Sequence, residues 1–266
     1  MTAGGSRGFD ARVAHPARVY DYWLGGKDNF EADRIAGEAT IAAYPQIRSS
    51  ARANRAFLVR TVHFLAAEAG IRQFLDIGTG LPTANNTHEI AQSVTPESRI
   101  VYVDNDPLVL SHARALLNSS PEGVTAYLDA DLRDTDRILE LAAGTLDFTQ
   151  PVAIMLLAIL HYIPDLDQAR RIVARLVSAV PSGSYVTISH AASDISPEEM
   201  AEMIRRMNEH LAEGNHVGRP REVVARFFDG LDLAEPGVVK VSEWRPASEL
   251  EAKAATSLWG GVGRKP

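Results

Sequence analysis

Three apolar segments of the 266-residue chain end in acidic residues. Asp76 lies in FLDIGTG, Asp104 follows RIVYV, and Asp131 lies in YLDADL. A carboxylate at position 104 can accept hydrogen bonds from both hydroxyls of a ribose, and one at position 131 can accept from an adenine amino group beside the N–H of Leu132. An Asp after a strand is also a common turn residue. Three in succession nevertheless favour a site for adenosine, with Asn105 as a further predicted contact.

The segment FLDIGTG also indicates which adenosine ligand to expect. Gly78 and Gly80 lack a Cβ and let the backbone approach a ligand closely, and a helix opening near Thr83 would point free N–H groups at it. The dinucleotide fingerprint has a third glycine where this chain has Pro82, and the carboxylate of Asp76 would repel a diphosphate. S-adenosylmethionine carries no phosphate but has an amino group and a sulfonium, so these residues favour it over NAD.

Alternating strands and helices must position these residues. Parallel strands that alternate with helices form a Rossmann-like α/β sheet, and ligands bind at the carboxyl ends of such strands. Five apolar segments predict the strands: 74–78, 99–104, 124–129, 152–159 and 184–190. Two more strand candidates follow, at 238–244 and 256–263, and the chain from 16 to 70 reads as helices. We expect a disordered tail (1–9), an N-terminal helical cap (10–72) and a ligand-binding domain (73–266).

Longer motifs carry a resemblance to a known family. The chain resembles the class I S-adenosylmethionine-dependent methyltransferases, and more narrowly a bacterial family formerly catalogued as a domain of unknown function. The resemblance covers nearly the whole chain, and YDYWLGGKDN is its most specific motif. It rests on residues 17–34, 52–60, 74–91, 101–117, 160–165 and 260–266.

The resemblance implies a fold and a set of contacts. The sheet would have seven strands in the order 3-2-1-4-5-7-6, with the last inserted strand antiparallel. Asp76, Gly78 and Gly80 would lie near the methionine part of S-adenosylmethionine, and Asp104 would lie at the ribose. Asp131 and Leu132 would lie at the adenine. The methyl acceptor is not implied.

The segment YDYWLGGKDN combines aromatic and polar residues beside a flexible break. One interpretation is a lid that folds over the cofactor and excludes water, with Tyr20, Gly26, Lys27 and Asn29 as its contacts. The other is an amphipathic helix that packs its aromatic residues on the sheet and ends at the glycines. The resemblance favours the lid. Arg55 could bind the cofactor carboxylate, or it could be one of several arginines on an exposed helix face.

His161 follows the fourth predicted strand, where an acceptor would lie, and is the candidate general base together with Tyr20 as a second catalytic candidate. It could equally be a packed histidine that is hydrogen-bonded to a loop. His190, at the end of the fifth strand, is a weaker candidate of the same kind. The other histidines considered have no helical metal-ligand spacing, so no metal site is expected. They are His15, His63, His88 and His112.

Composition limits the class of function. The net charge of −7 and the lack of a long basic run disfavour nucleic-acid binding. The chain has no cysteine, which fits a cytoplasmic protein, and its most apolar run (152–163) is too short to span a bilayer. The expected function is methyl transfer from S-adenosylmethionine to a small molecule. Two alternatives remain: a sensor that binds S-adenosylmethionine without turnover, and a nicotinamide-dependent oxidoreductase.

Overall fold

The structure is a computed structural model that describes residues 10–116, 119–212 and 214–266, so the tail predicted for 1–9 lies outside the described residues. Within these residues eight strands form one sheet in the order β3-β2-β1-β4-β5-β8-β6, and β7 also pairs with β8. The strands β1 to β5 are parallel, and β8 runs antiparallel to β5. The strands are β1 (Gln73–Ile77), β2 (Arg99–Asp104), β3 (Val124–Asp129), β4 (Ala153–Leu157), β5 (Tyr185–Ala191), β6 (Asp232–Leu233), β7 (Val239–Lys240) and β8 (Leu258–Arg264).

This order confirms the predicted Rossmann-like sheet, with one difference in its last strands. The strand predicted at 238–244 stops at Lys240, and the short β6 adds an eighth strand. Beyond Lys240 the chain turns, because Val241 and Trp244 are buried in the core and do not continue the strand. The guanidinium of Arg60 donates to the carbonyls of both residues, at 2.6 and 2.8 Å, while the N–H of Val241 still donates to the carbonyl of Leu258 in β8 at 3.1 Å.

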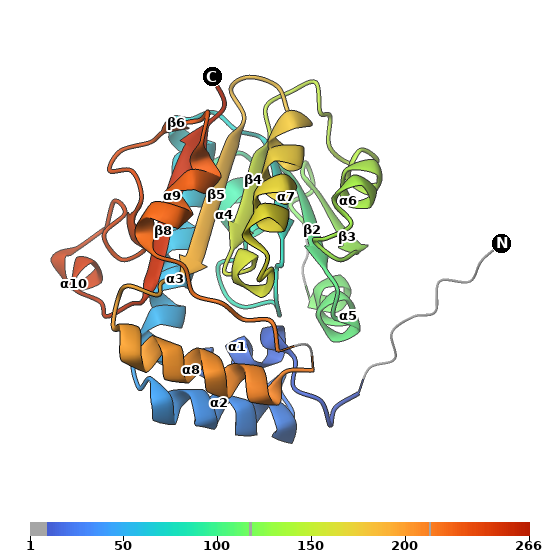
Figure 1. Ribbon diagram of the computed structural model, residues 1–266. Helices are drawn as coiled ribbons and strands as arrows, with labels where there is room; N and C mark the ends of the chain where they lie inside the picture. The colour runs from blue at the N-terminus through green and yellow to red at the C-terminus, as the bar shows by residue number, and fades with distance from the viewer. Residues whose placement is uncertain (1–9, 117–118, 213) are drawn as a thin grey trace.

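The helices cover both faces of the sheet and one end of it. In Figure 1, α1, α2 and α8 form a group below the end of the sheet to which the arrow of β5 points. This is the end where the parallel strands finish. The helices are α1 (Pro16–Leu24), α2 (Glu31–Ala43), α3 (Ile47–His63), η1 (Phe64–Glu68), α4 (Thr87–Val94), α5 (Pro107–Leu116), α6 (Thr135–Ala142), η2 (Leu160–Tyr162), α7 (Leu166–Ser178), α8 (Pro197–His210), α9 (Arg221–Ala225), η3 (Arg226–Phe228) and α10 (Glu249–Ala252).

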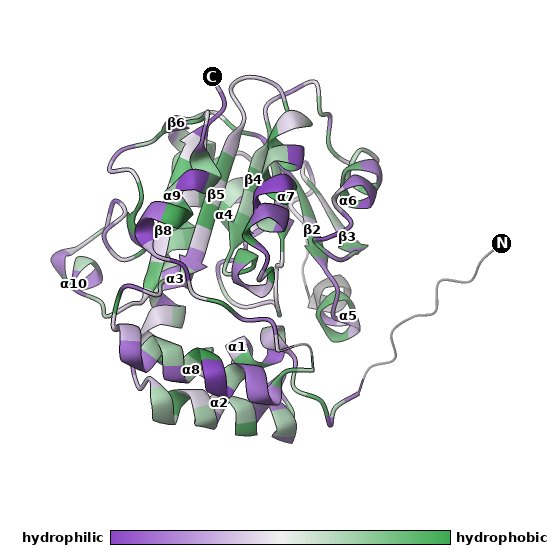
Figure 2. Ribbon diagram, in the orientation of Figure 1, coloured by the Kyte–Doolittle hydropathy of each residue, from purple (hydrophilic) through white to green (hydrophobic). Residues whose placement is uncertain are grey.

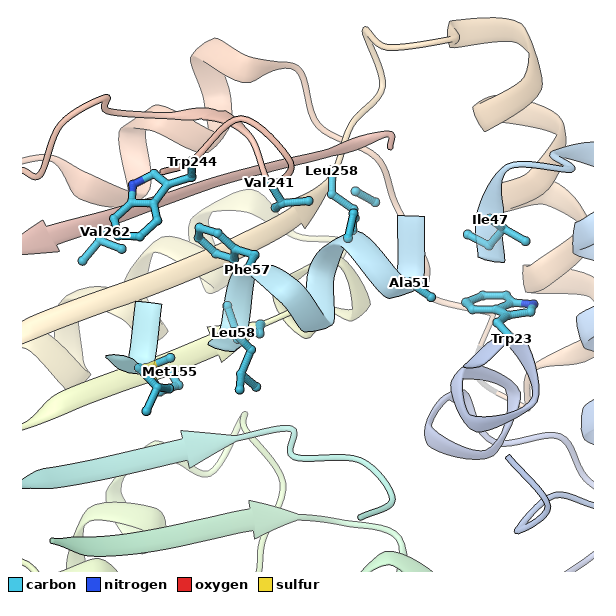
Figure 3. Packing of buried hydrophobic residues seen from close by; sticks show 14 of the residues in the cluster. Trp23, Ile47, Ala51, Phe57, Leu58, Met155, Val241, Trp244, Leu258 and Val262 are labelled. Carbon is cyan, nitrogen blue, oxygen red and sulfur yellow. The ribbon is translucent and has the colours of Figure 1, made fainter. Parts of the chain in front are cut away.

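Two apolar clusters, one on each face of the sheet, make the strands rigid. Side chains alternate between the two faces, so Phe74 joins one cluster while Leu75 and Ile77 join the other. Figure 2 shows the strands as mainly apolar ribbons under helices with polar outer faces. On the α3 face, Phe57 packs edge-on against Trp244 with ring centroids 5.6 Å apart, as Figure 3 shows. The strand ends are therefore held in fixed register.

Buried charges fasten α1 to the end of β2. The side chain of Arg18 is almost fully buried, and its guanidinium lies 3.5 Å from the carboxylate of Asp33 and 3.3 Å from that of Asp106. His15 Nδ1 lies 3.0 Å from the same Asp106 carboxylate. Asp106 stands between β2 and α5, so these contacts place the first helix over the carboxyl end of the sheet.

Candidate active site

The carboxyl ends of β1, β2 and β3 meet at one edge, as the sequence predicts. The register pairs Ile77 with Val103, and Asp104 with Asp129. A cavity of about 340 Å³ opens at this edge and continues under α1 and α8. Six of the predicted cofactor residues line it: Gly78, Gly80, Asp104, Asn105, Asp131 and Leu132. The cofactor role of each remains a prediction.

The two glycines form a tight turn after β1. Gly78 and Gly80 both have positive φ, +75° and +69°, which favours glycine. The N–H of Gly78 donates to the carbonyl of Val103 at 2.8 Å, so the turn is anchored to β2. A Cβ on Gly78 would lie 2.6 Å from Cγ1 of Ile159, whereas one on Gly80 would meet nothing within 4 Å. The turn therefore fits closely against the loop that follows β4.

Asp104 is a buried carboxylate with remaining capacity to accept hydrogen bonds. Its side chain accepts from the N–H of Gly80 at 2.9 Å and from the N–H of Asp106 at 3.0 Å. Burial raises the pKa of Asp104, and these two backbone donors oppose that rise. A carboxylate has about four lone-pair sites, so two remain for donors such as ribose hydroxyls.

Asp76 lies behind the turn and is not part of the cavity wall. Thr87 Oγ1 donates to its carboxylate at 2.6 Å, and burial raises the pKa of Asp76 to about 6. The helix predicted to open near Thr83 begins at Thr87, where Asn86 and Glu89 form a capping box. The first free N–H groups of α4 therefore lie further along the chain than predicted.

Arg55 does line the cavity, but its guanidinium is committed to the loop between β1 and α4. It donates to the carbonyls of Ala84 and Asn85 at 3.1 and 2.9 Å. The structure thus gives Arg55 a loop-holding role that differs from both predicted interpretations. Its binding of a cofactor carboxylate stays a prediction.

The residues predicted to contact adenine line the cavity after β3. Asp131 accepts from the backbone N–H of Arg133 at 2.9 Å and forms an ion pair with its guanidinium at 3.2 Å. Asn105 reaches across from the end of β2, and its amide lies 3.4 Å from Asp131. Leu132 is buried beside them. This combination provides an apolar surface next to a hydrogen-bond acceptor, which is what an adenine ring requires.

The predicted lid residues divide into two groups. Tyr20 lines the cavity, and its hydroxyl donates to the carbonyl of Ala51 at 3.0 Å and accepts from Asn54 at 3.1 Å. Because its hydrogen is already donated and burial raises its pKa, Tyr20 is poorly suited to act as a base.

Gly26, Lys27 and Asn29 do not line the cavity. They form a turn around Asp21: the N–H of Gly26 donates to its carbonyl at 2.9 Å, the Asn29 amide donates to its carboxylate at 2.8 Å, and Lys27 is exposed. Glycine and amide residues occur both in ligand-binding loops and in ordinary turns, so the local sequence does not distinguish the two. Here Gly25 ends α1 in the left-handed conformation. Contact of these residues with the cofactor remains a prediction.

Two histidines line the other part of the cavity. His161, on η2, is 5% exposed, and His216, in the loop after α8, is 3% exposed. Their ring centroids lie 4.5 Å apart. Nδ1 of His161 and both ring nitrogens of His216 have no hydrogen-bond partner in the part of the chain that the structure describes. His190 lies outside the cavity wall, with Nδ1 against the carbonyl of Ala191 and Nε2 2.7 Å from the guanidinium of Arg219.

Both cavity histidines are uncharged at neutral pH. Burial lowers the pKa of His161 well below 6.5, and the neighbouring histidines and Arg219 add to this effect. Burial also lowers the pKa of His216 to about 4. Sequence reasoning missed His216, because it lies in an irregular segment and meets His161 only through the fold. Within the described residues, no group of three or more His, Cys, Asp or Glu side chains is arranged to hold a metal ion.

Comparison with known proteins identifies the family. The family described as S-adenosyl methyltransferase matches residues 2–266. The chain belongs to this family. The methyltransferase is similar over its length to two solved structures. A DUF574 family protein from Streptomyces avermitilis MA-4680 is 46% identical with a TM-score of 0.92, covering 97% of this chain and 99% of that one. A Thermobifida fusca YX protein assigned to the methyltransferases is 41% identical with a TM-score of 0.89, covering 99% of each chain.

More distant structures share the fold alone. An O-methyltransferase family protein from Burkholderia thailandensis is 15% identical with a TM-score of 0.53, covering 88% of this chain and 59% of that one. No match was found among the curated proteins. No helix in the described ranges is long and apolar enough to cross a membrane.

These findings confirm the predicted family and its cofactor, S-adenosylmethionine, and they do not support the nicotinamide-dependent alternative. The residues at the strand ends fit such a ligand. Gly78 provides a backbone surface without a side chain, and Asp104 has unused acceptor sites beside it. The strand ends therefore offer space and acceptor groups that fit the adenosine part of this cofactor, and the individual contacts stay predictions.

Proposed function

We propose that this protein transfers a methyl group from S-adenosylmethionine to a small molecule held between the strand ends and His161. The observation that carries the proposal is the continuity of one cavity, which runs from Asp104 and Asp131 at the strand ends to His161 under α8. The nucleoside would lie on Asp104 and Asp131, and the methionine part beside Gly78 and Gly80. The sulfonium of the cofactor supplies an activated methyl group.

The protein's task in this reaction is to position the acceptor and exclude water. Alignment of two reactants in one cavity can supply about 7–11 kcal/mol of barrier reduction, without an obligatory catalytic side chain. A cavity of about 340 Å³ is at the lower end of the range for small-molecule sites. This volume includes the proposed cofactor site, so the space left beside His161 suits only a small acceptor. A sensor without turnover would be expected to have this space filled, so the open space favours catalysis.

The helices over the cavity support a cap. We propose that residues 10–72 cover the cavity together with α8, whose buried Met200, Met203 and Met207 lie on the face toward the other helices. Tyr20 of α1 and Met203 of α8 both line the cavity. We also propose a cytoplasmic location, which the lack of cysteine supports.

Calorimetry and isotope transfer test the function. The purified protein is titrated with S-adenosylmethionine, S-adenosylhomocysteine and NAD, and we expect binding of the first two only. A metabolite extract is then incubated with the protein and a cofactor carrying a deuterated methyl group, and mass spectrometry identifies the labelled product. Tight binding of NAD, or cofactor binding with no labelled product from any extract, would contradict the proposal.

A further inference from the structure

The part of the cavity away from β1, β2 and β3 has an apolar wall, and we call it the acceptor chamber. Its wall includes Trp23, Tyr44, Ile47, Met200, Met203 and Leu258. Figure 3 shows Trp23, Ile47 and Leu258 around the start of α3. The polar atoms of its aromatic residues are satisfied by the protein: Trp23 Nε1 donates to Thr40 at 3.1 Å, and the Tyr44 hydroxyl lies 2.9 Å from that of Ser257.

Charged side chains on the cavity wall lie elsewhere. Asp104, Asp131 and Arg133 stand after β2 and β3, and Arg55 is bound to the loop after β1. In the described part of the chamber wall there is no Asp, Glu, Lys or Arg. Among the described wall residues, an ammonium or carboxylate in the chamber would find no counter-ion to offset its lost hydration, which disfavours both.

Two histidines provide unused hydrogen-bonding groups in the chamber. Nδ1 of His161 and both nitrogens of His216 are buried without a partner among the described residues, although buried polar groups normally have one. A neutral imidazole carries one N–H donor and one bare acceptor nitrogen. Each ring therefore has one donor and one acceptor nitrogen to offer to a polar group of a ligand.

A buried cation lies behind these rings. The guanidinium of Arg219 donates to the carbonyls of Leu160 and Ile163 and to His190, and it forms no salt bridge in the described part of the chain. Its charge further opposes a protonated amine in the chamber.

From these observations we propose that the acceptor is an uncharged aromatic compound with a hydroxyl group, a phenol, whose ring lies among the apolar residues and whose hydroxyl donates to a bare nitrogen of His161 or His216. This inference rests on the proposed function, because it names the substrate class of the same cavity. Transfer forms a bond between the hydroxyl oxygen and the methyl carbon and breaks the carbon–sulfur bond, whose electron pair stays on sulfur. The hydroxyl proton passes to the imidazole nitrogen.

The weak basicity of the two histidines is sufficient if the proton leaves the hydroxyl group only as the methyl group is transferred. A phenol is a much weaker acid than imidazolium at its ordinary pKa, so neither ring removes the proton before transfer. As the methyl–oxygen bond forms, the oxygen becomes strongly acidic and even a poor base can accept its proton. Because the pKa of His216 is lowered to about 4, this ring does not keep the proton at neutral pH.

Binding of matched probes tests the substrate class separately from activity. The protein saturated with S-adenosylhomocysteine is titrated with 2-naphthol, 2-methoxynaphthalene, 2-naphthylmethylamine and 2-naphthoic acid at pH 7. We expect 2-naphthol to bind at least tenfold more tightly than each of the other three. His216→Phe should remove its advantage over 2-methoxynaphthalene, whereas His63→Phe, on an exposed position of α3, should retain it.

The results separate two failures. If S-adenosylhomocysteine binds and the amine or the acid binds as tightly as 2-naphthol, the phenol assignment is wrong and the proposed function stands. If S-adenosylhomocysteine does not bind, the proposed function fails and the inference fails with it. The wild-type probe series decides the substrate class even if His216→Phe does not fold.

Discussion

Replacement of Gly78 by alanine in the turn after β1 should lower the free energy of unfolding by more than its positive φ angle alone predicts. A non-glycine residue in the left-handed region costs about 1–2 kcal/mol. The added Cβ would also lie 2.6, 2.8 and 2.9 Å from Cγ1, Cδ1 and Cβ of Ile159. Since Cβ of Ile159 is fixed to the backbone, this side chain cannot simply rotate away, and overpacking of this kind costs about 1–3 kcal/mol. We expect a total loss of about 2–5 kcal/mol in the free energy of unfolding.

Gly70→Ala is the matched control, because Gly70 has φ of +73° and a Cβ there would meet nothing within 4 Å. In urea denaturation, Gly70→Ala should lower the free energy of unfolding only by the backbone strain of about 1–2 kcal/mol. Because Ile159 lines the cavity, its displacement in Gly78→Ala should also raise the Kd for S-adenosylhomocysteine about ten- to hundredfold. The double variant with Gly78→Ala and Ile159→Ala should recover part of the lost stability. Equal stability losses in the two alanine variants would refute the steric reasoning.

Three further changes test other parts of the structure. Asp104→Asn removes the charge that strengthens hydrogen bonds to ribose, worth about 1.5–3 kcal/mol, so calorimetry should show a Kd for S-adenosylhomocysteine about ten- to hundredfold higher. Asp129→Asn, on its exposed register partner, should leave the Kd unchanged. Arg18→Leu leaves two buried carboxylates without their cation and should cost about 3–5 kcal/mol in urea denaturation, whereas Arg12→Leu at an exposed ion pair should not move the midpoint. The pKa of His216 falls from 6.5 to about 4 on folding, so the unfolded chain binds this proton first as pH decreases; stability present above pH 6.5 should decline by about 3 kcal/mol toward pH 4. A Tm that stays constant from pH 7 to 4.5 would contradict this, and His216→Phe should make the decline shallower.

The sheet and its ligand edge were predictable because their signals are local in the sequence. A buried parallel strand is a short apolar run, and Asp104 and Asp131 follow such runs directly, so the topology of parallel strands brings them together. The segment after Lys240 has the same apolar character as a strand. Sequence alone cannot show that Arg60, far away in the chain, donates hydrogen bonds to the carbonyls of Val241 and Trp244 in this segment.

The acceptor chamber was less predictable because distant segments build it. His161 was a candidate from its place after β4, but its partner His216 comes from the loop after α8 and carries no pattern of its own. The turn at Gly26 and Asn29 shows the converse case. Its residue types suit a ligand loop as well as a turn, and in the structure they enclose Asp21, while their contact with a cofactor stays a prediction.

The anchoring of α1 has a consequence for turnover. Asp106 receives Arg18 through its side chain, and its backbone N–H donates to the carboxylate of Asp104. Asp106 therefore contacts both α1, which covers the cavity, and Asp104, the proposed nucleoside contact. The free energies of α1 docking and of nucleoside binding are linked through it, and the linkage acts equally in both directions. S-adenosylhomocysteine, the product, would then stay bound until α1 separates from the end of β2. The rate of exchange of product for fresh cofactor would then depend on the breaking of the buried ion pairs of Arg18.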